Sequence, residues 1–131
     1  MKIKKIKTKH DKYTKTLLDE MYYCFKKNKY NSGSMLFRPL LINYVVNLGE
    51  DINNITNIDY GQAINYISSK QIFHNKEIKL FKKLKNEVNE INHNFKLANE
   101  DIAKNIWDAT VILYSKKSKV KNRKLNKVKN I

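Results

Sequence analysis

Three polar residues at steps of four, Lys85, Asn89 and His93, form the one place in the chain where a cation, an amide and a base could meet on one surface. They lie beside an apolar stripe of helical period, made of Ile78, Phe81, Leu84, Val88 and Ile91. At about 100° per residue they fall on one flank of a helix, at the border between core and solvent. An imidazole titrates near neutral pH and suits general acid–base catalysis. This flank is therefore our candidate catalytic site.

The same three residues also have an ordinary structural interpretation. A His near the C-terminus of a helix interacts favourably with the last carbonyl groups and with the helix dipole. Lys85 and Asn89 would then be ordinary residues of the flank. Because spacing alone does not establish geometry, both interpretations stay open at this stage.

The sequence around these residues resembles the HEPN superfamily of small helical domains, and within it a branch of unknown function that accompanies restriction and defence proteins. In that branch the penultimate helix carries a basic residue, an Asn four residues on and a His four residues after that. Lys85, Asn89 and His93 occupy those positions. A loop and an acidic-capped last helix follow in the branch, as Asn99-Glu100-Asp101 does here.

The resemblance covers roughly residues 14 to 115 and is best from 60 to 114. It departs from the family at two positions. Val88 stands where the HEPN ribonucleases place an Arg, five residues before the His. The branch itself usually has Arg where this chain has Lys85.

HEPN ribonucleases act without a metal ion, at a cleft between two copies of the chain. The resemblance implies that His93 takes a proton from an RNA 2′-hydroxyl or gives one to the leaving 5′-oxygen. Lys85 would offset charge on the phosphorane, and Asn89 would orient the imidazole or the phosphate. What it implies is a homodimeric, metal-independent endoribonuclease from a defence or mobile-element setting, with no cofactor.

The charge of the chain is concentrated at its two ends. The net charge is +15, yet residues 1–15 hold seven Lys and one Asp, and residues 116–131 hold seven Lys, one Arg and no acid. Basic blocks of this kind are typically disordered and attract phosphate non-specifically. We expect contacts with RNA or another polyanion from Lys116, Lys117, Lys119, Lys121, Arg123 and Lys124. The alternative is compositional, since AT-rich coding sequences also enrich Lys, Asn and Ile.

Composition and periodicity predict an all-α fold. The chain has three Gly and one Pro, and its apolar residues recur at helical spacing. We expect one bundle of about five helices over residues 13–115, between disordered basic tails at 1–12 and 116–131. Residues 28–33 form a polar break. The expected helices are 13–27, one starting at 34 or 39 and ending at 48, 60–68 with Asp59 as its candidate cap, 75–92, and one capped by Asn99 that ends at 114.

The last of these helices is apolar on most of its circumference. Besides one core face, it carries a second apolar face made of Trp107, Val111 and Tyr114. Such a helix is either central in a bundle or shared with a partner. We therefore expect a homodimer interface at these three residues, with burial beneath the first two helices as the alternative.

Cysteine use and hydropathy point to the cytoplasm. The single Cys24 excludes an internal disulfide and fits a reducing compartment. No apolar stretch follows the basic N-terminus, as a secretory signal would require, and the longest apolar run, 40–48, is too short to span a membrane. Three scattered His and one Cys make a zinc site improbable, so we expect no metal.

Three functions follow from these expectations. The first is an RNA-directed protein of the HEPN type, with the ribonuclease activity described above. The second is a non-catalytic module whose basic tails bind nucleic acid. The third is a protein-binding regulator, such as a phage protein that blocks a host enzyme.

Overall fold

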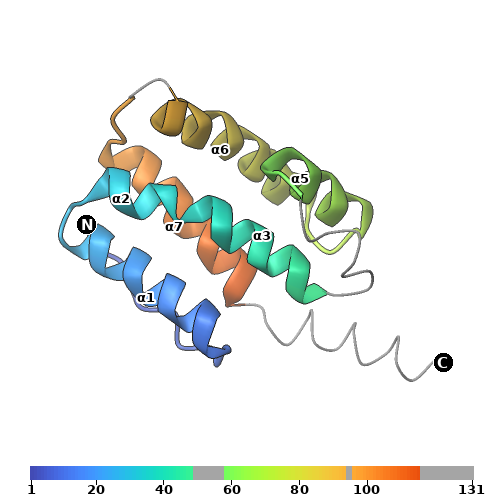
Figure 1. Ribbon diagram of the computed structural model, residues 1–131, viewed down its shortest axis with the longest axis horizontal. Coiled ribbons are helices and arrows are strands. Elements are labelled where there is room, and N and C mark those ends of the chain that lie inside the picture. Colours follow the sequence, from blue (N-terminus) through green and yellow to red (C-terminus); the bar gives the residue numbers. More distant parts are fainter. Residues whose placement is uncertain (49–57, 94–95, 116–131) are drawn as a thin grey trace.

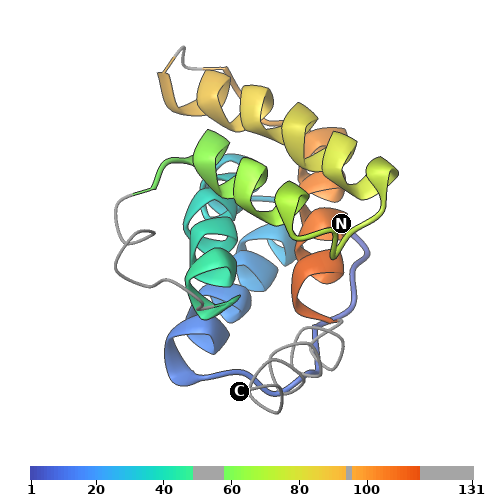
Figure 2. The same cartoon turned by 90° about the vertical axis from the view of Figure 1, so that its right-hand side faces the viewer.

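The chain folds as an all-α bundle, as predicted (Figures 1 and 2). The computed structural model describes residues 1–48, 58–93 and 96–115, and within these ranges the regular structure is helical throughout. The helices are α1 (Lys12–Lys26), α2 (Tyr30–Met35), α3 (Phe37–Leu48), α5 (Tyr60–Ser69), α6 (Asn75–His93) and α7 (Glu100–Tyr114). In Figure 1, α3 and α7 lie between α1 on one side and α6 on the other. None of the described helices is both long and apolar enough to cross a membrane.

Local capping signals set the starts of three helices. The Asp11 side chain accepts a hydrogen bond from the Thr14 amide and begins α1. Asp59 and Gln62 form a reciprocal capping box at the start of α5. Asn99 caps α7, whose first turn is acidic and so complements the positive end of the helix dipole. The caps predicted at Asp59 and Asn99 are confirmed.

The polar break predicted at residues 28–33 is mostly helix. The chain turns at Asn28, which has a positive φ of 60°, and α2 then begins at Tyr30. Gly33 lets α2 pack closely on α1, because a Cβ at this position would lie 2.4 Å from the Phe25 ring. Polar composition therefore misled the prediction, since the helix depends on a close contact with α1 rather than on its own apolar stripe.

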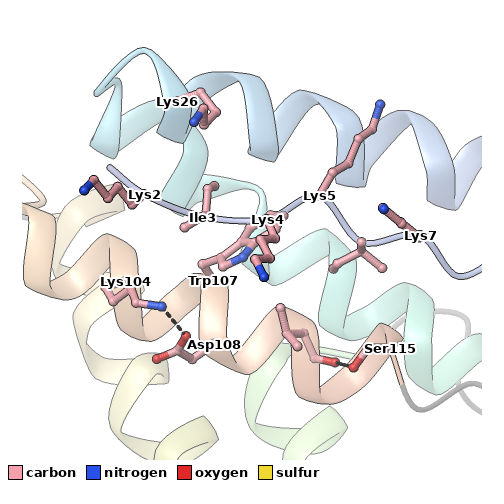
Figure 3. Close-up of a pocket in the computed structure, with 12 residues that line it drawn as sticks. Lys2, Ile3, Lys4, Lys5, Lys7, Lys26, Lys104, Trp107, Asp108 and Ser115 are labelled. Carbon is pink, nitrogen blue, oxygen red and sulfur yellow. Dashed lines mark hydrogen bonds and ion pairs between the residues drawn. The ribbon is translucent and has the colours of Figure 1, made fainter.

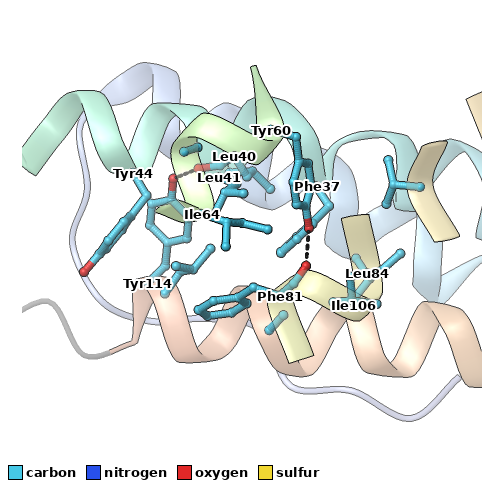
Figure 4. Close-up of a cluster of buried hydrophobic side chains, with 14 of the residues drawn as sticks. Phe37, Leu40, Leu41, Tyr44, Tyr60, Ile64, Phe81, Leu84, Ile106 and Tyr114 are labelled. Atoms are coloured by element: carbon cyan, nitrogen blue, oxygen red, sulfur yellow. Dashed lines mark hydrogen bonds between the residues drawn. The ribbon is translucent and has the colours of Figure 1, made fainter. Parts of the chain in front are cut away.

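The core gathers aromatic and aliphatic side chains from α3, α5, α6 and α7 (Figure 4). Two buried phenols satisfy their hydroxyls on backbone carbonyls across it. The Tyr60 hydroxyl donates to the Phe81 carbonyl at 3.1 Å, and the Tyr114 hydroxyl donates to the Leu40 carbonyl. Burial raises the pKa of both phenols well above the usual range, so both stay protonated at neutral pH.

The N-terminal segment, expected as a disordered tail, instead lies against the bundle. We call residues 1–11 the strap. Its start is held by a hydrogen bond from the terminal amine of Met1 to Asn28 Oδ1 at 3.0 Å. Its end is held by His10, whose Nε2 hydrogen-bonds the Tyr114 carbonyl at 3.0 Å. Between these points Ile3 and Ile6 pack half-buried against the core, which outweighs the tendency of a basic segment to stay in solvent.

Candidate functional site

The three residues of the candidate catalytic site lie along one side of α6. Lys85 and Asn89 are half-buried, whereas His93 is exposed and is the last residue of the helix. With a rise of 1.5 Å per residue, the backbone positions of Lys85 and His93 are about 12 Å apart. The flank therefore runs from the packed surface of the domain to an exposed residue at the end of the helix.

The ammonium group of Lys85 does not point along this flank. It lies over the start of α5, where Nζ is 3.0 Å from the position that a Cβ on Gly61 would occupy. The carboxylate of Asp59, the cap of α5, is 3.5 Å from the same position. The cation therefore sits near an acidic helix cap, two helical turns from the imidazole of His93. The catalytic role of Lys85, Asn89 and His93 stays a prediction.

Val88 occupies the position that the resemblance assigns to an arginine. Its side chain is fully buried in the core, on the same stripe as Leu84 and Ile91. A residue at this position faces the interior of the domain. The α6 flank therefore offers no guanidinium to a bound phosphate at that point.

The residues expected at a homodimer interface have partners within the chain. Trp107 is 3 % exposed and its ring lies 5.9 Å from that of Tyr22 and 6.3 Å from that of Phe25. Tyr114 is also 3 % exposed, while Val111 is half-buried. A single copy therefore covers most of this face of α7 with α1, α3 and the strap. This arrangement corresponds to the alternative interpretation, in which the face is buried within one chain.

A cleft of about 840 Å³ lies where the strap crosses between α1 and α7 (Figure 3). Ile3, Ile6, Trp107 and Val111 give it an apolar floor. Figure 3 shows Trp107 beneath the strap, with Lys26 on α1 above it and Lys104 on α7 below. Six lysines line the cleft: Lys2, Lys4, Lys5, Lys7, Lys26 and Lys104.

Most of these lysines carry uncompensated charge. Lys5 pairs with Asp19 at 3.5 Å, and Lys104 pairs with Asp108 at 2.9 Å. In the part of the chain that the structure describes, the other four form no ion pair: Lys2, Lys4, Lys7 and Lys26. All four are exposed. The cleft therefore combines an apolar floor with a rim of solvent-facing positive charge.

Sequence reasoning missed this cluster, although a signal for it was present. The segment Lys2-Ile3-Lys4-Lys5-Ile6-Lys7 places two apolar residues three positions apart inside a basic block. In an extended segment with three residues per turn, residues three apart lie on the same side, so both isoleucines can dock while the lysines face solvent. The six basic residues predicted to bind nucleic acid, from Lys116 to Lys124, lie outside the described residues.

Two further findings bear on the kind of site. Among the residues that the structure describes, no three His, Cys, Asp or Glu side chains come together in a way that could hold a metal ion. Comparisons with protein-family models, with curated proteins and with solved structures found no match for this chain.

Proposed function

We propose that this protein is a non-catalytic nucleic-acid-binding module that holds the phosphate backbone on the basic cleft between α1, α7 and the strap. The observation that carries the proposal is the strap, which fixes lysines on the folded surface by burying the isoleucines between them. Lysines held in place bind a polyanion with less loss of entropy than lysines on a free chain. Phosphate contacts of this kind supply affinity without reading sequence.

The dimensions of the strap suit several phosphates. An extended chain spans at most about 3.3–3.6 Å per residue, so Lys2 and Lys7 stand up to about 17 Å apart. Lys26 adds a charge from α1 on the same rim. Lys104 adds a charge from α7. The cleft thus gathers lysines from the strap, α1 and α7 on one surface.

The test compares two sets of four exposed lysines on opposite sides of the bundle. One variant changes Lys2, Lys4, Lys7 and Lys26 to Gln. Its control changes four α6 lysines to Gln and removes the same charge: Lys76, Lys79, Lys82 and Lys83. RNA binding is measured by fluorescence anisotropy over a range of salt concentrations.

The cleft variant should bind RNA more weakly and with a shallower salt dependence. Each lost contact with a single strand lowers the slope of log K against log[salt] by about 0.7, so the slope falls by up to about 3. The α6 control should keep nearly the wild-type slope. Equal losses in both variants would show that only net charge matters and would overturn the assignment to this cleft.

A second measurement separates binding from catalysis. End-labelled tRNA and a generic single-stranded RNA are incubated in EDTA with the wild-type protein and with His93→Ala. We expect the RNA to stay intact with both proteins. Cleavage by the wild type alone, leaving 2′,3′-cyclic phosphate ends, would replace the proposal by the metal-independent endoribonuclease and place His93 in its site.

A further inference from the structure

An exposed tyrosine stands beside the basic cleft. Tyr23 on α1 is 59 % exposed. Its ring packs edge-to-face on Tyr22, with centroids 6.1 Å apart and planes at 75°. Tyr22 in turn lies 5.9 Å from Trp107, on the cleft floor. A short aromatic series therefore leads from the cleft floor to the surface and ends in an accessible phenol ring.

Helical geometry places Tyr23 on the strap side of α1. At 100° per residue, Tyr23 lies about 60° around the helix from Lys26, a cleft residue, and about 40° from Asp19. Asp19 pairs with Lys5 of the strap. The ring is thus adjacent to the basic rim and is itself outside the cleft.

Tyr13 provides an internal comparison on the same helix. It is 58 % exposed, nearly the same as Tyr23. It lies about 140° around the helix from Lys26 and, ten residues before Tyr23, about 15 Å further along the axis. Tyr13 is therefore an equally accessible ring that does not adjoin the cleft.

We propose that Tyr23 is a base-stacking platform, so that the cleft takes a single strand of nucleic acid with its phosphates on the strap lysines and one base on this ring. The inference rests on the proposed function and adds the class of ligand. Single-strand-binding surfaces combine a basic track with aromatic rings on which bases stack, and the preference is independent of sequence. In a duplex the bases are already stacked on one another, so the ring finds no free partner.

The experiment measures binding of the full-length protein to a short poly-uridine RNA, to the same strand lacking its bases, and to an RNA duplex of equal length. The variants are Tyr23→Ala, Tyr23→Phe and Tyr13→Ala. Tyr23→Ala should weaken binding to poly-uridine by about 5- to 150-fold. Tyr23→Phe and Tyr13→Ala should bind as the wild type does, because stacking needs the ring but not the hydroxyl.

Binding to the strand without bases distinguishes stacking on Tyr23 from a structural role of this residue. Tyr23→Ala and wild type should bind that strand, and the duplex, with equal affinity. An equal loss on all three ligands would show that Tyr23 acts through folding or charge placement, and no loss on poly-uridine would show that it does not stack; either result overturns the inference. Failure of the wild type to bind any of the three would instead overturn the proposed function.

Discussion

The α6 flank and the strap cleft gather polar residues in opposite ways. On α6, Lys85, Asn89 and His93 share one helix and a regular spacing, yet the ammonium of Lys85 lies over α5 while His93 is the exposed last residue of the helix. At the cleft, charges from the strap, α1 and α7 meet although they are far apart in sequence. The functional groups of the candidate catalytic residues are thus apart in space, whereas the lysines of the cleft lie together on one surface.

The difference follows from what fixes each side chain. A helix sets the direction of each Cα–Cβ bond, but the end of a long side chain can turn toward a favourable group nearby. The end of the Lys85 side chain lies over the start of α5, where Asp59 also lies. The strap lysines, in contrast, are placed by backbone that the half-buried isoleucines hold against the bundle. A binding surface therefore depends here on apolar anchors more than on the spacing of polar residues.

The largest expected contrast is between Trp107 and His93. Trp107→Ala removes a buried ring from beneath the strap and should lower the free energy of unfolding by about 3–5 kcal/mol. His93→Ala removes an exposed side chain and should change it by no more than about 0.5 kcal/mol. Urea unfolding followed by far-UV circular dichroism measures both. A large loss for His93→Ala would mean that the end of α6 is a constrained site after all.

The two glycines next to these regions give a second contrast. Gly33→Ala places a Cβ 2.4 Å from the buried Phe25 ring and should destabilise the fold by about 1–3 kcal/mol. Gly61→Ala meets the flexible end of Lys85 at 3.0 Å and the Asp59 carboxylate at an ordinary contact distance of 3.5 Å, and it removes a glycine from the first turn of α5. It should be neutral or stabilise by up to about 1 kcal/mol. Thermal melts of both variants test this.

An equal loss at Gly61 would carry a specific meaning. It would show that the ammonium of Lys85 is held rigidly over α5 rather than free to move aside. The α6 flank would then contain a positioned cation, and its candidate role in catalysis would gain support.

The contribution of the two strap isoleucines to docking can be tested by substitution. Replacing Ile3 and Ile6 together by Ser removes half-buried apolar surface and should cost about 1–2 kcal/mol. Trp107 is the single tryptophan of the chain, so its fluorescence reports on the strap directly. The double variant should shift its emission to the red and increase quenching by acrylamide. Leu97→Ser, at an exposed leucine, is the control and should leave the emission unchanged.

Local signals carried most of the fold prediction. The stripe Ile78, Phe81, Leu84, Val88 and Ile91 is the buried face of α6, as periodicity predicted. The caps at Asp59 and Asn99 were also correct, because a cap and the amide it bonds are only three residues apart. The described ranges hold six helices, in keeping with the expected bundle of about five, and the additional one is the short α2 at the polar break.

The parts that were missed depend on contacts between distant segments. The strap needs a groove made by α1 and α7, and α7 lies about a hundred residues from Ile3 along the chain. No local sequence pattern describes such a groove. The direction of Lys85 depends in the same way on α5. For the candidate site, the sequence predicted which residues share a flank but not where their functional groups point.

The stability of the protein at alkaline pH depends on the two buried phenols that connect α6 and the strap end to the core. Tyr60 bonds a carbonyl of α6, and Tyr114 bonds α3 and lies beside the strap residue His10. Burial raises the pKa of both in the folded state. Their contribution is therefore fully present below the ordinary tyrosine pKa of about 10 and is lost as pH rises above it.

The free energy of unfolding should thus fall above pH 10 by up to about 1.4 kcal/mol per pH unit for each buried phenol. Tyr60→Phe and Tyr114→Phe should each make this fall with pH shallower by the contribution of one phenol. Each should also lower the free energy of unfolding at neutral pH by about 1 kcal/mol through the lost hydrogen bond. If Tyr114→Phe alone failed to reduce it, the strap end of the core would have to open to solvent before the phenol ionises, and the strap would be the less stable of the two regions.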